Sequence, residues 1–168
     1  PLPSNPTYLI SPDQLLSSRS TYYGEKINDC AFINNNPIPD RIELYKTLSQ
    51  RISVDSYGKL YNNVGYILGG DEAAKIQILK TTKTCISYEN TFTIGYNTEK
   101  IIQPYSVGSI AIYSGGLDRT VFNSGSLFYK QDYNSTSDMV EDILSTITSR
   151  DRYLAKLNQP LFVNDKFI

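Results

Sequence analysis

Polar and titratable side chains are concentrated in one short stretch of this 168-residue sequence, between positions 88 and 101. It contains two carboxylates, one ammonium group, two amides and two phenols, which belong to Glu89, Glu99, Lys100, Asn90, Asn97, Tyr88 and Tyr96. Carboxylates and amides hydrogen bond to hydroxyl groups, and a lysine can neutralise an anion such as a phosphate. The residue types therefore indicate a binding loop for a small polar ligand.

The elements on either side of this stretch would position its side chains. Residues 85–88 have a strand-like composition, whereas Ile101, Ile102 and Tyr105 recur at helical spacing. The polar stretch thus joins a strand to a helix, and open α/β sheets bind ligands at such junctions, against a helix N-terminus. The spacing alone predicts a ligand site near residues 89–100.

Each of these residues also has an ordinary structural explanation. Thr98 or Asn97 could cap the following helix, and Glu99 would be favourable in its first turn without any ligand. Pro104 is expected to kink or shorten that helix. Both interpretations stay open at this point.

The remaining sequence alternates between strand and helix patterns. Strands are predicted at 27–33, 52–54, 84–88, 109–113 and the end of 122–129, and helices at 38–51, 71–78, 138–147 and 150–157. Asp71 is the expected cap of the second of these helices. Alternating strands and helices predict an α/β fold with a parallel sheet and helices on both faces.

The first twenty residues have a different composition. Four prolines, at positions 1, 3, 6 and 12, predict an extended linker, and residues 13–16 could form one helical turn. Because the sequence does not begin with Met, we expect it to be a piece of a longer protein. No apolar run approaches the roughly 20 residues needed to span a membrane, and no signal peptide is expected.

Composition narrows the possible functions. The net charge is −1 and there is no block of basic residues, which argues against a nucleic-acid partner. The sequence contains no histidine, so histidine-based catalytic triads and histidine-ligated zinc are excluded within it. Cys30 and Cys85 lie in short apolar runs, which favours two buried thiols over a disulfide.

Arg41 is unusual for its predicted position. With Asp40 as the N-cap, Arg41 would lie in the first turn of the helix at 38–51, where a cation opposes the helix dipole. It is either a solvated surface arginine or a residue that meets an anion at the helix N-terminus.

A family resemblance rests on the same stretch. Tyr88-Glu89-Asn90-Thr91, followed by Tyr96-Asn97-Thr98-Glu99-Lys100-Ile101, closely resembles the motif of the α-1,3-fucosyltransferases of glycosyltransferase family 10. Further segments resemble the family in register, namely 30–41, 110–115 and 122–127. The resemblance covers roughly residues 22–160.

The resemblance implies a particular fold and domain organisation. We expect a Rossmann-like parallel sheet flanked by helices, the donor-binding half of a GT-B glycosyltransferase. Residues 1–25 would be a linker or the remnant of a preceding domain, and residues 26–168 the nucleotide-sugar (donor) binding domain. An amino-terminal domain outside this chain would bind the acceptor glycan and supply the catalytic base, so no catalytic residue is expected here.

The resemblance also implies an activity: inverting, metal-independent transfer of fucose from GDP-fucose to a sugar hydroxyl, with no cofactor. Arg41 and Lys100 match the two family cations on the diphosphate, and Glu99 matches a carboxylate on sugar or ribose hydroxyls. Tyr96 and Asn90 match further donor-binding residues of the family. Glu89 matches a residue that shapes the loop.

Departures from the family pattern support two alternatives. Ala111 replaces a proline and Ser114 a tryptophan, which would suit another GDP-sugar or a catalytically inactive binding or assembly module. We expect a cytoplasmic location if the source is microbial or viral, and the Golgi lumen if it is an animal or plant. The sequon at 134–136 would matter only in a secretory compartment.

Overall fold

The computed structural model describes residues 19–163, which contain one five-stranded sheet. All strand pairs are parallel and the order is β2-β1-β3-β4-β5. The strands are β1 (Asn28–Phe32), β2 (Val54–Ser56), β3 (Thr82–Tyr88), β4 (Ile110–Ser114) and β5 (Phe128–Tyr129). The predicted α/β class with a parallel sheet is confirmed, whereas the helical turn expected at 13–16 lies outside the described residues.

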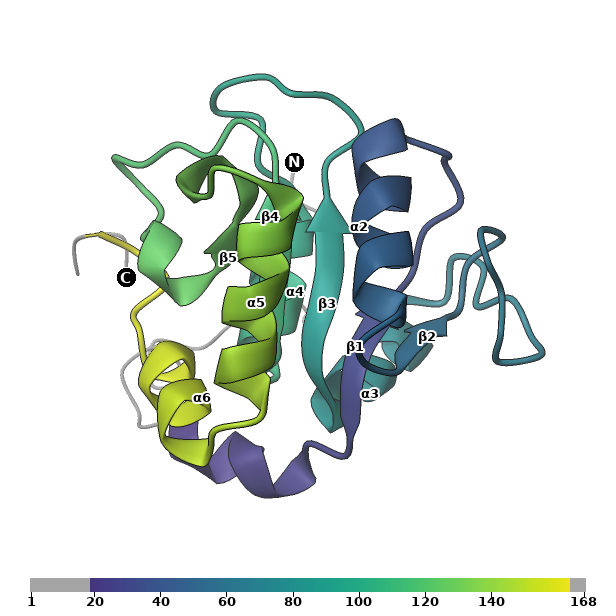
Figure 1. Ribbon diagram of the computed structural model, residues 1–168, viewed down its shortest axis with the longest axis horizontal. Helices are drawn as coiled ribbons and strands as arrows, with labels where there is room; N and C mark the ends of the chain where they lie inside the picture. Colours follow the sequence, from purple (N-terminus) through teal and green to yellow (C-terminus); the bar gives the residue numbers. More distant parts are fainter. Residues whose placement is uncertain (1–18, 164–168) are drawn as a thin grey trace.

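Helices cover both faces of the sheet. They are α2 (Pro39–Ser49), α3 (Glu72–Thr81), α4 (Glu99–Ser106), α5 (Thr136–Ile147) and α6 (Arg150–Leu157), with 3-10 helices η2 (Arg19–Glu25), η3 (Ser124–Ser126) and η4 (Lys130–Asp132). In Figure 1, α2 and α5 lie in front of the sheet, and α3 and α4 lie behind it. None of the helices within residues 19–163 is long and apolar enough to cross a membrane.

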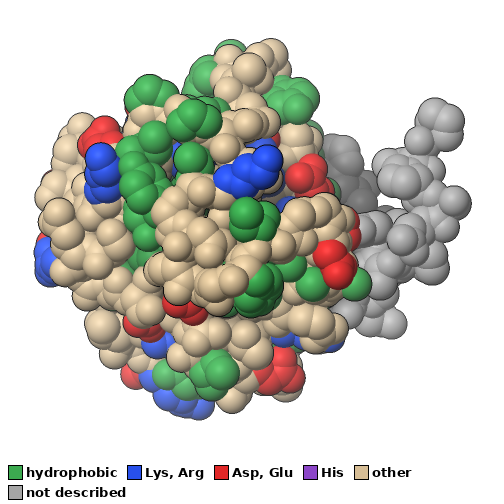
Figure 2. Space-filling model, turned by 90° about the vertical axis from the view of Figure 1, so that its right-hand side faces the viewer, with side chains coloured by type: hydrophobic (Ala, Val, Ile, Leu, Met, Phe, Trp, Pro, Cys, Tyr) green, Lys and Arg blue, Asp and Glu red, His purple; other side chains and the backbone are tan. Residues whose placement is uncertain are grey.

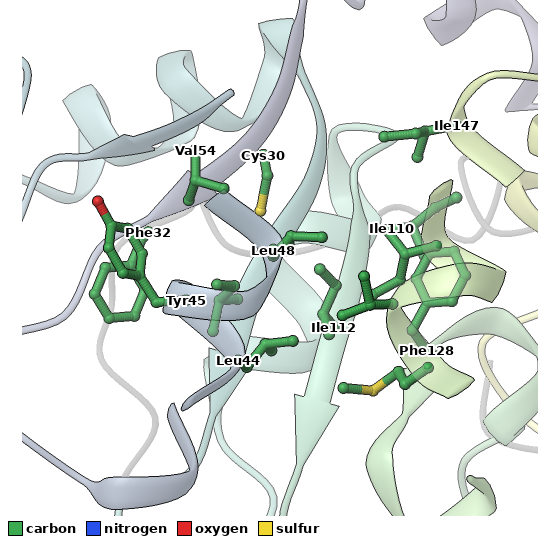
Figure 3. Packing of buried hydrophobic residues seen from close by; sticks show 14 of the residues in the cluster. Cys30, Phe32, Leu44, Tyr45, Leu48, Val54, Ile110, Ile112, Phe128 and Ile147 are labelled. Atoms are coloured by element: carbon green, nitrogen blue, oxygen red, sulfur yellow. The ribbon is translucent and has the colours of Figure 1, made fainter. Parts of the chain in front are cut away.

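The core follows from the alternation of side chains along each strand. Cys30 and Phe32 join the cluster under α2, α5 and α6, whereas Ala31 between them joins a second cluster on the opposite face. Figure 3 shows Leu44 and Leu48 of α2 packed against this first face of the sheet. Burying each leucine contributes about 1.5–3 kcal/mol, so α2 is firmly seated on the sheet.

Two predicted boundaries near α2 were wrong. Asp40 is not the N-cap: Ile38 occupies that position without a side-chain cap bond, and Pro39 begins the helix. The second strand begins at Val54 rather than at Ile52, because the Ile52 amide donates to the Leu48 carbonyl and continues the helix end.

Other local predictions were confirmed. Asp71 caps α3 by accepting from the Ala74 amide at 3.0 Å, and Thr98 caps α4. Pro104 lies in the last turn of α4, which is only eight residues long. Cys30 and Cys85 are buried free thiols on opposite faces of the sheet.

The 3-10 helix η2 is held against the end of α4. The Arg19 guanidinium lies 3.5 Å from the centroid of the Tyr105 ring and donates to the Tyr105 carbonyl. Gly108 follows α4 with a φ of +74°, and a Cβ at this position would lie 2.4 Å from Cβ of Tyr22. A glycine is therefore required where η2 meets α4.

We expect Gly108→Ala to lower the free energy of unfolding by about 2–4 kcal/mol. The left-handed conformation costs an alanine about 1–2 kcal/mol, and the clash with Tyr22 adds a further cost of overpacking. Denaturant unfolding measures the difference. Gly24→Ala is the control, because a Cβ there would meet nothing within 4 Å; equal stabilities of the two variants would contradict the expectation.

Candidate functional site

The strand order predicts where a ligand would bind. The chain leaves β1 to form β2 on one side and then returns to form β3 on the other, so the order reverses between β1 and β3. In open parallel sheets, ligands bind outside the carboxyl ends of the strands at this reversal. The segments that follow β1, β3 and β4 meet at this edge, which is uppermost in Figure 1. We call it the carboxyl edge.

Arg41 joins two of these segments. One guanidinium nitrogen donates to the Asn36 carbonyl after β1 at 3.0 Å. The other donates to the Tyr88 carbonyl at the end of β3 at 2.5 Å and to Asn90 Oδ1 at 3.1 Å. Burial lowers the pKa of Arg41, and the negative charge of Glu89 opposes this effect, so the guanidinium remains charged.

The environment of Arg41 excludes one of its two sequence interpretations. It is not a solvated surface residue, because only 1% of it is exposed. The signal was present in the sequence: Arg41 lies at helical spacing from Leu44, Tyr45 and Leu48, which face the sheet. Its Nε has no hydrogen-bond partner among the described residues, so the guanidinium retains a free donor.

Glu89 and Lys100 form the second charged group at this edge. Lys100 Nζ lies 3.0 Å from Glu89 Oε2, and the Glu89 side chain is 1% exposed. The other carboxylate oxygen accepts from the Thr98 amide at 3.1 Å, the Thr98 hydroxyl at 2.7 Å and the Tyr113 hydroxyl at 3.3 Å. Glu89 therefore closes the loop 90–97 at its base and fixes Lys100 in the first turn of α4.

The segment after β4 leaves room for this arrangement. A Cβ on Gly115 would lie 2.6 Å from the Tyr113 hydroxyl and 2.8 Å from Cγ of Glu89. A Cβ on Gly116 would lie 2.0 Å from the Thr93 carbonyl oxygen, because the two backbones run side by side. The Gly-Gly pair is therefore a packing requirement of the loop.

Two residues of the network were not predicted as such. Asn97 donates to the Tyr113 hydroxyl at 3.0 Å and to the Gly116 carbonyl at 3.3 Å, and it accepts from the Asp118 amide at 3.2 Å. Burial raises the pKa of Tyr113, so its phenol stays neutral and can donate to Glu89. A tyrosine in an otherwise aliphatic buried strand is the available sequence signal, because a buried phenol requires a partner.

The other predicted site residues lie on the outside of the loop. Tyr96 is 49% exposed, and Asn90 and Glu99 are also exposed. Within residues 19–163, the side chains of Tyr96 and Glu99 have no hydrogen-bond or ionic partner. The structure thus brings all six predicted residues to one edge. Arg41 and Glu89 are buried, and the Lys100 side chain is 22% exposed. Asn90, Tyr96 and Glu99 are exposed.

The described residues form no broad field of one charge sign on the face that Figure 2 shows. Figure 2 looks onto the right-hand side of Figure 1 and shows Lys and Arg side chains interspersed with Asp and Glu. The segment 57–71 has three exposed large hydrophobic residues, Tyr61, Tyr66 and Ile67. No cluster of three or more potential metal ligands occurs among the described residues.

Comparison with protein families gives one assignment. A model described as glycosyltransferase family 10 (fucosyltransferase), carboxyl-terminal part, matches residues 25–158. A protein of Acanthamoeba polyphaga mimivirus named as a fucosyltransferase is 30% identical over 161 residues, covering 89% of this chain and 26% of that protein. The human 4-galactosyl-N-acetylglucosaminide 3-alpha-L-fucosyltransferase 9 is 26% identical over 133 residues, covering 77% and 36%.

Solved structures agree with this assignment. An α1,3-fucosyltransferase crystallised with GDP-fucose has a TM-score of 0.75 and 30% identity, covering 84% of this chain and 41% of its own. The same type of enzyme with GDP has a TM-score of 0.74 and 29% identity, covering 82% and 40%. The chain therefore spans between a quarter and about two fifths of the length of these relatives.

We expect Lys100→Met to lower the free energy of unfolding by about 3–5 kcal/mol, because it leaves the buried Glu89 carboxylate without a counter-ion. The double variant Glu89→Gln/Lys100→Met should recover most of this loss, since the neutral amide can still accept from Thr98. Denaturant unfolding of the single and double variants measures both effects.

Lys83→Met is the matched control. Lys83 and Lys100 have side chains that are 21% and 22% exposed, but the partner of Lys83, Asp29, is 33% exposed whereas Glu89 is 1% exposed. An accessible carboxylate can be rehydrated, so this variant should lose about 1 kcal/mol or less. Equal losses for the two lysine variants would contradict the importance of Glu89 burial.

Proposed function

The chain belongs to glycosyltransferase family 10, the fucosyltransferases, and we propose that it is the donor-binding domain of an enzyme that transfers fucose from GDP-fucose. One observation carries this proposal. Arg41 and Lys100, which lie far apart in the sequence, are held against the consecutive residues Tyr88 and Glu89 at the carboxyl edge. Two cations at the reversal point of a parallel sheet suit a nucleoside diphosphate.

The chemistry of transfer requires positive charge at this position. When the acceptor hydroxyl displaces GDP from the anomeric carbon, the bond between the sugar and the diphosphate breaks and negative charge accumulates on the diphosphate. Fixed cations stabilise this charge in the transition state. Lys100 has three N–H donors, of which Glu89 takes one, so it can bind phosphate oxygens while it remains anchored.

Arg41 would bind the diphosphate by exchanging one hydrogen-bond acceptor, the Asn90 amide oxygen, for a phosphate oxygen. Asn90 is exposed, and its amide oxygen accepts from the buried guanidinium at 3.1 Å. A phosphate oxygen carries negative charge and suits the planar guanidinium, so it is a stronger acceptor for Arg41 than a neutral amide oxygen. Movement of Asn90 would give the donor access to Arg41, and the amide could then bind another part of the donor.

The exposed residues would recognise the remainder of the donor. Glu99 begins α4, and its carboxylate has no partner within residues 19–163, which suits ribose or sugar hydroxyls. Tyr96 presents a half-exposed ring on the same loop. We assign the acceptor glycan and the catalytic base to an amino-terminal domain of the longer protein, which is consistent with the fraction of its relatives that this chain spans.

Binding of GDP is expected to be saturable with a Kd below about 1 mM, that is, a binding free energy stronger than about −4 kcal/mol. Isothermal titration calorimetry of the full chain measures it. We propose that Arg41 and Lys100 neutralise the diphosphate without a metal, so the affinity should be the same with EDTA as with added Mg²⁺. Binding only in Mg²⁺ would contradict metal independence, and no binding in either condition would contradict the proposed function.

Glu99→Gln is expected to weaken GDP-fucose binding about tenfold or more, because a charged hydrogen bond to a hydroxyl contributes about 1.5–3 kcal/mol. Its melting temperature should fall only slightly, because the carboxylate has no partner within the described residues and the variant loses only a favourable charge in the first turn of α4. Glu43→Gln, on the exposed side of α2, is the control. Equal affinities of the two variants would remove Glu99 from the site.

A further inference from the structure

A third basic side chain lies at the carboxyl edge. Lys130 follows β5 directly, and its Nζ forms an ion pair with Asp40 in the first turn of α2. The same Nζ lies 6.0 Å from the centroid of the Tyr88 ring. The backbone carbonyl of the same residue, Tyr88, accepts from Arg41, so Lys130 reaches back from β5 to the residue at the end of β3 that also holds Arg41.

Neighbouring elements support this location. Gln131, the next residue after Lys130, donates to the Ser114 hydroxyl at the end of β4 at 3.1 Å. Lys130 is therefore fixed between the ends of β4 and β5 on one side and the N-terminus of α2 on the other. The segments that follow three different strands, β1, β3 and β5, thus contribute one cation each to the same edge: Arg41, Lys100 and Lys130.

Each of these cations is held by an acceptor of the protein, and the acceptors differ in how easily they can be replaced. Glu89 is 1% exposed and also holds the loop, so it cannot leave Lys100 without a large cost. Asp40 is 58% exposed, and Lys130 is 26% exposed. Exposed ion pairs are weak because water can solvate both charges, so the pair between Asp40 and Lys130 is readily exchanged.

We propose that Lys130 is a third diphosphate-binding residue, which exchanges Asp40 for a phosphate oxygen when the nucleoside diphosphate binds. The proposal rests on the proposed function, since it assumes that this edge takes a diphosphate. Asp40 would turn to water and remain near the positive end of α2, where a carboxylate is favourable without Lys130. Asp40 therefore competes with the ligand for Lys130.

The competition distinguishes this role from a purely structural one. If the ion pair only joins β5 to α2, removal of either partner has the same consequence. If Lys130 binds the ligand, removal of the lysine weakens binding, whereas removal of the competing carboxylate strengthens it. The two variants Lys130→Met and Asp40→Asn are therefore expected to change GDP affinity in opposite directions.

Calorimetric titration of the full chain with GDP, and separately with guanosine, provides the test. We expect Lys130→Met to weaken GDP binding at least about fivefold, a loss that diminishes at high salt because ions screen exposed charges. Asp40→Asn should tighten GDP binding about two- to threefold, within the range of weak exposed ion pairs. Guanosine lacks the phosphates, so its affinity should be the same in both variants.

Lys46→Met is the matched control, because Lys46 lies in the last turn of α2, away from the carboxyl edge. Melting temperatures of all variants establish that they are folded. The inference is overturned if Lys130→Met binds GDP as the wild type does, or if Asp40→Asn weakens binding to the same extent as Lys130→Met. If the wild type binds GDP, either of these results overturns the role of Lys130 and leaves the proposed function standing. If the wild type does not bind GDP, the proposed function and the role of Lys130 are both overturned.

Discussion

The buried carboxylate of Glu89 is the constraint on which the carboxyl edge depends. An ionised group that is 1% exposed is stable only if its lone pairs are satisfied, and this one accepts from Lys100, from Thr98 twice and from Tyr113. These partners belong to α4, to its cap and to β4, so a single charge joins three segments. Gly115 has no side chain because Glu89 and Tyr113 occupy that space.

This constraint gives the site a rigid base and a replaceable outer layer. Glu89 and Tyr113 are buried beneath the loop, whereas Asn90 and Asp40 are exposed and hold their cations through single contacts. In the proposed function, anion binding is an exchange of acceptors in which the ligand replaces the accessible ones. The cations would then be positioned before the ligand arrives, which would reduce the cost of reorganisation at the moment of reaction.

Periodicity and local chemistry were sufficient for most elements but not for the boundaries of α2. The strand at β3 and the caps Asp71 and Thr98 could be predicted, because each depends on neighbouring residues only. Asp40 is a good capping residue by type, yet its carboxylate pairs with Lys130, 90 positions away. A prediction from neighbouring residues alone could not foresee a partner so far along the chain. In the structure, Ile38 is the N-cap and Pro39 begins the helix.

The sequence by itself determined the alternation of strands and helices and the position of the polar loop between β3 and α4, because both depend on residues close together in the chain. It also contained the family motif that identifies the loop. Only the tertiary structure decided that Arg41 is buried against Tyr88, that Glu89 is the anchor of Lys100, and that Lys130 lies at the same edge. These contacts join residues up to 90 positions apart, and they form only when parallel strands bring their carboxyl ends together.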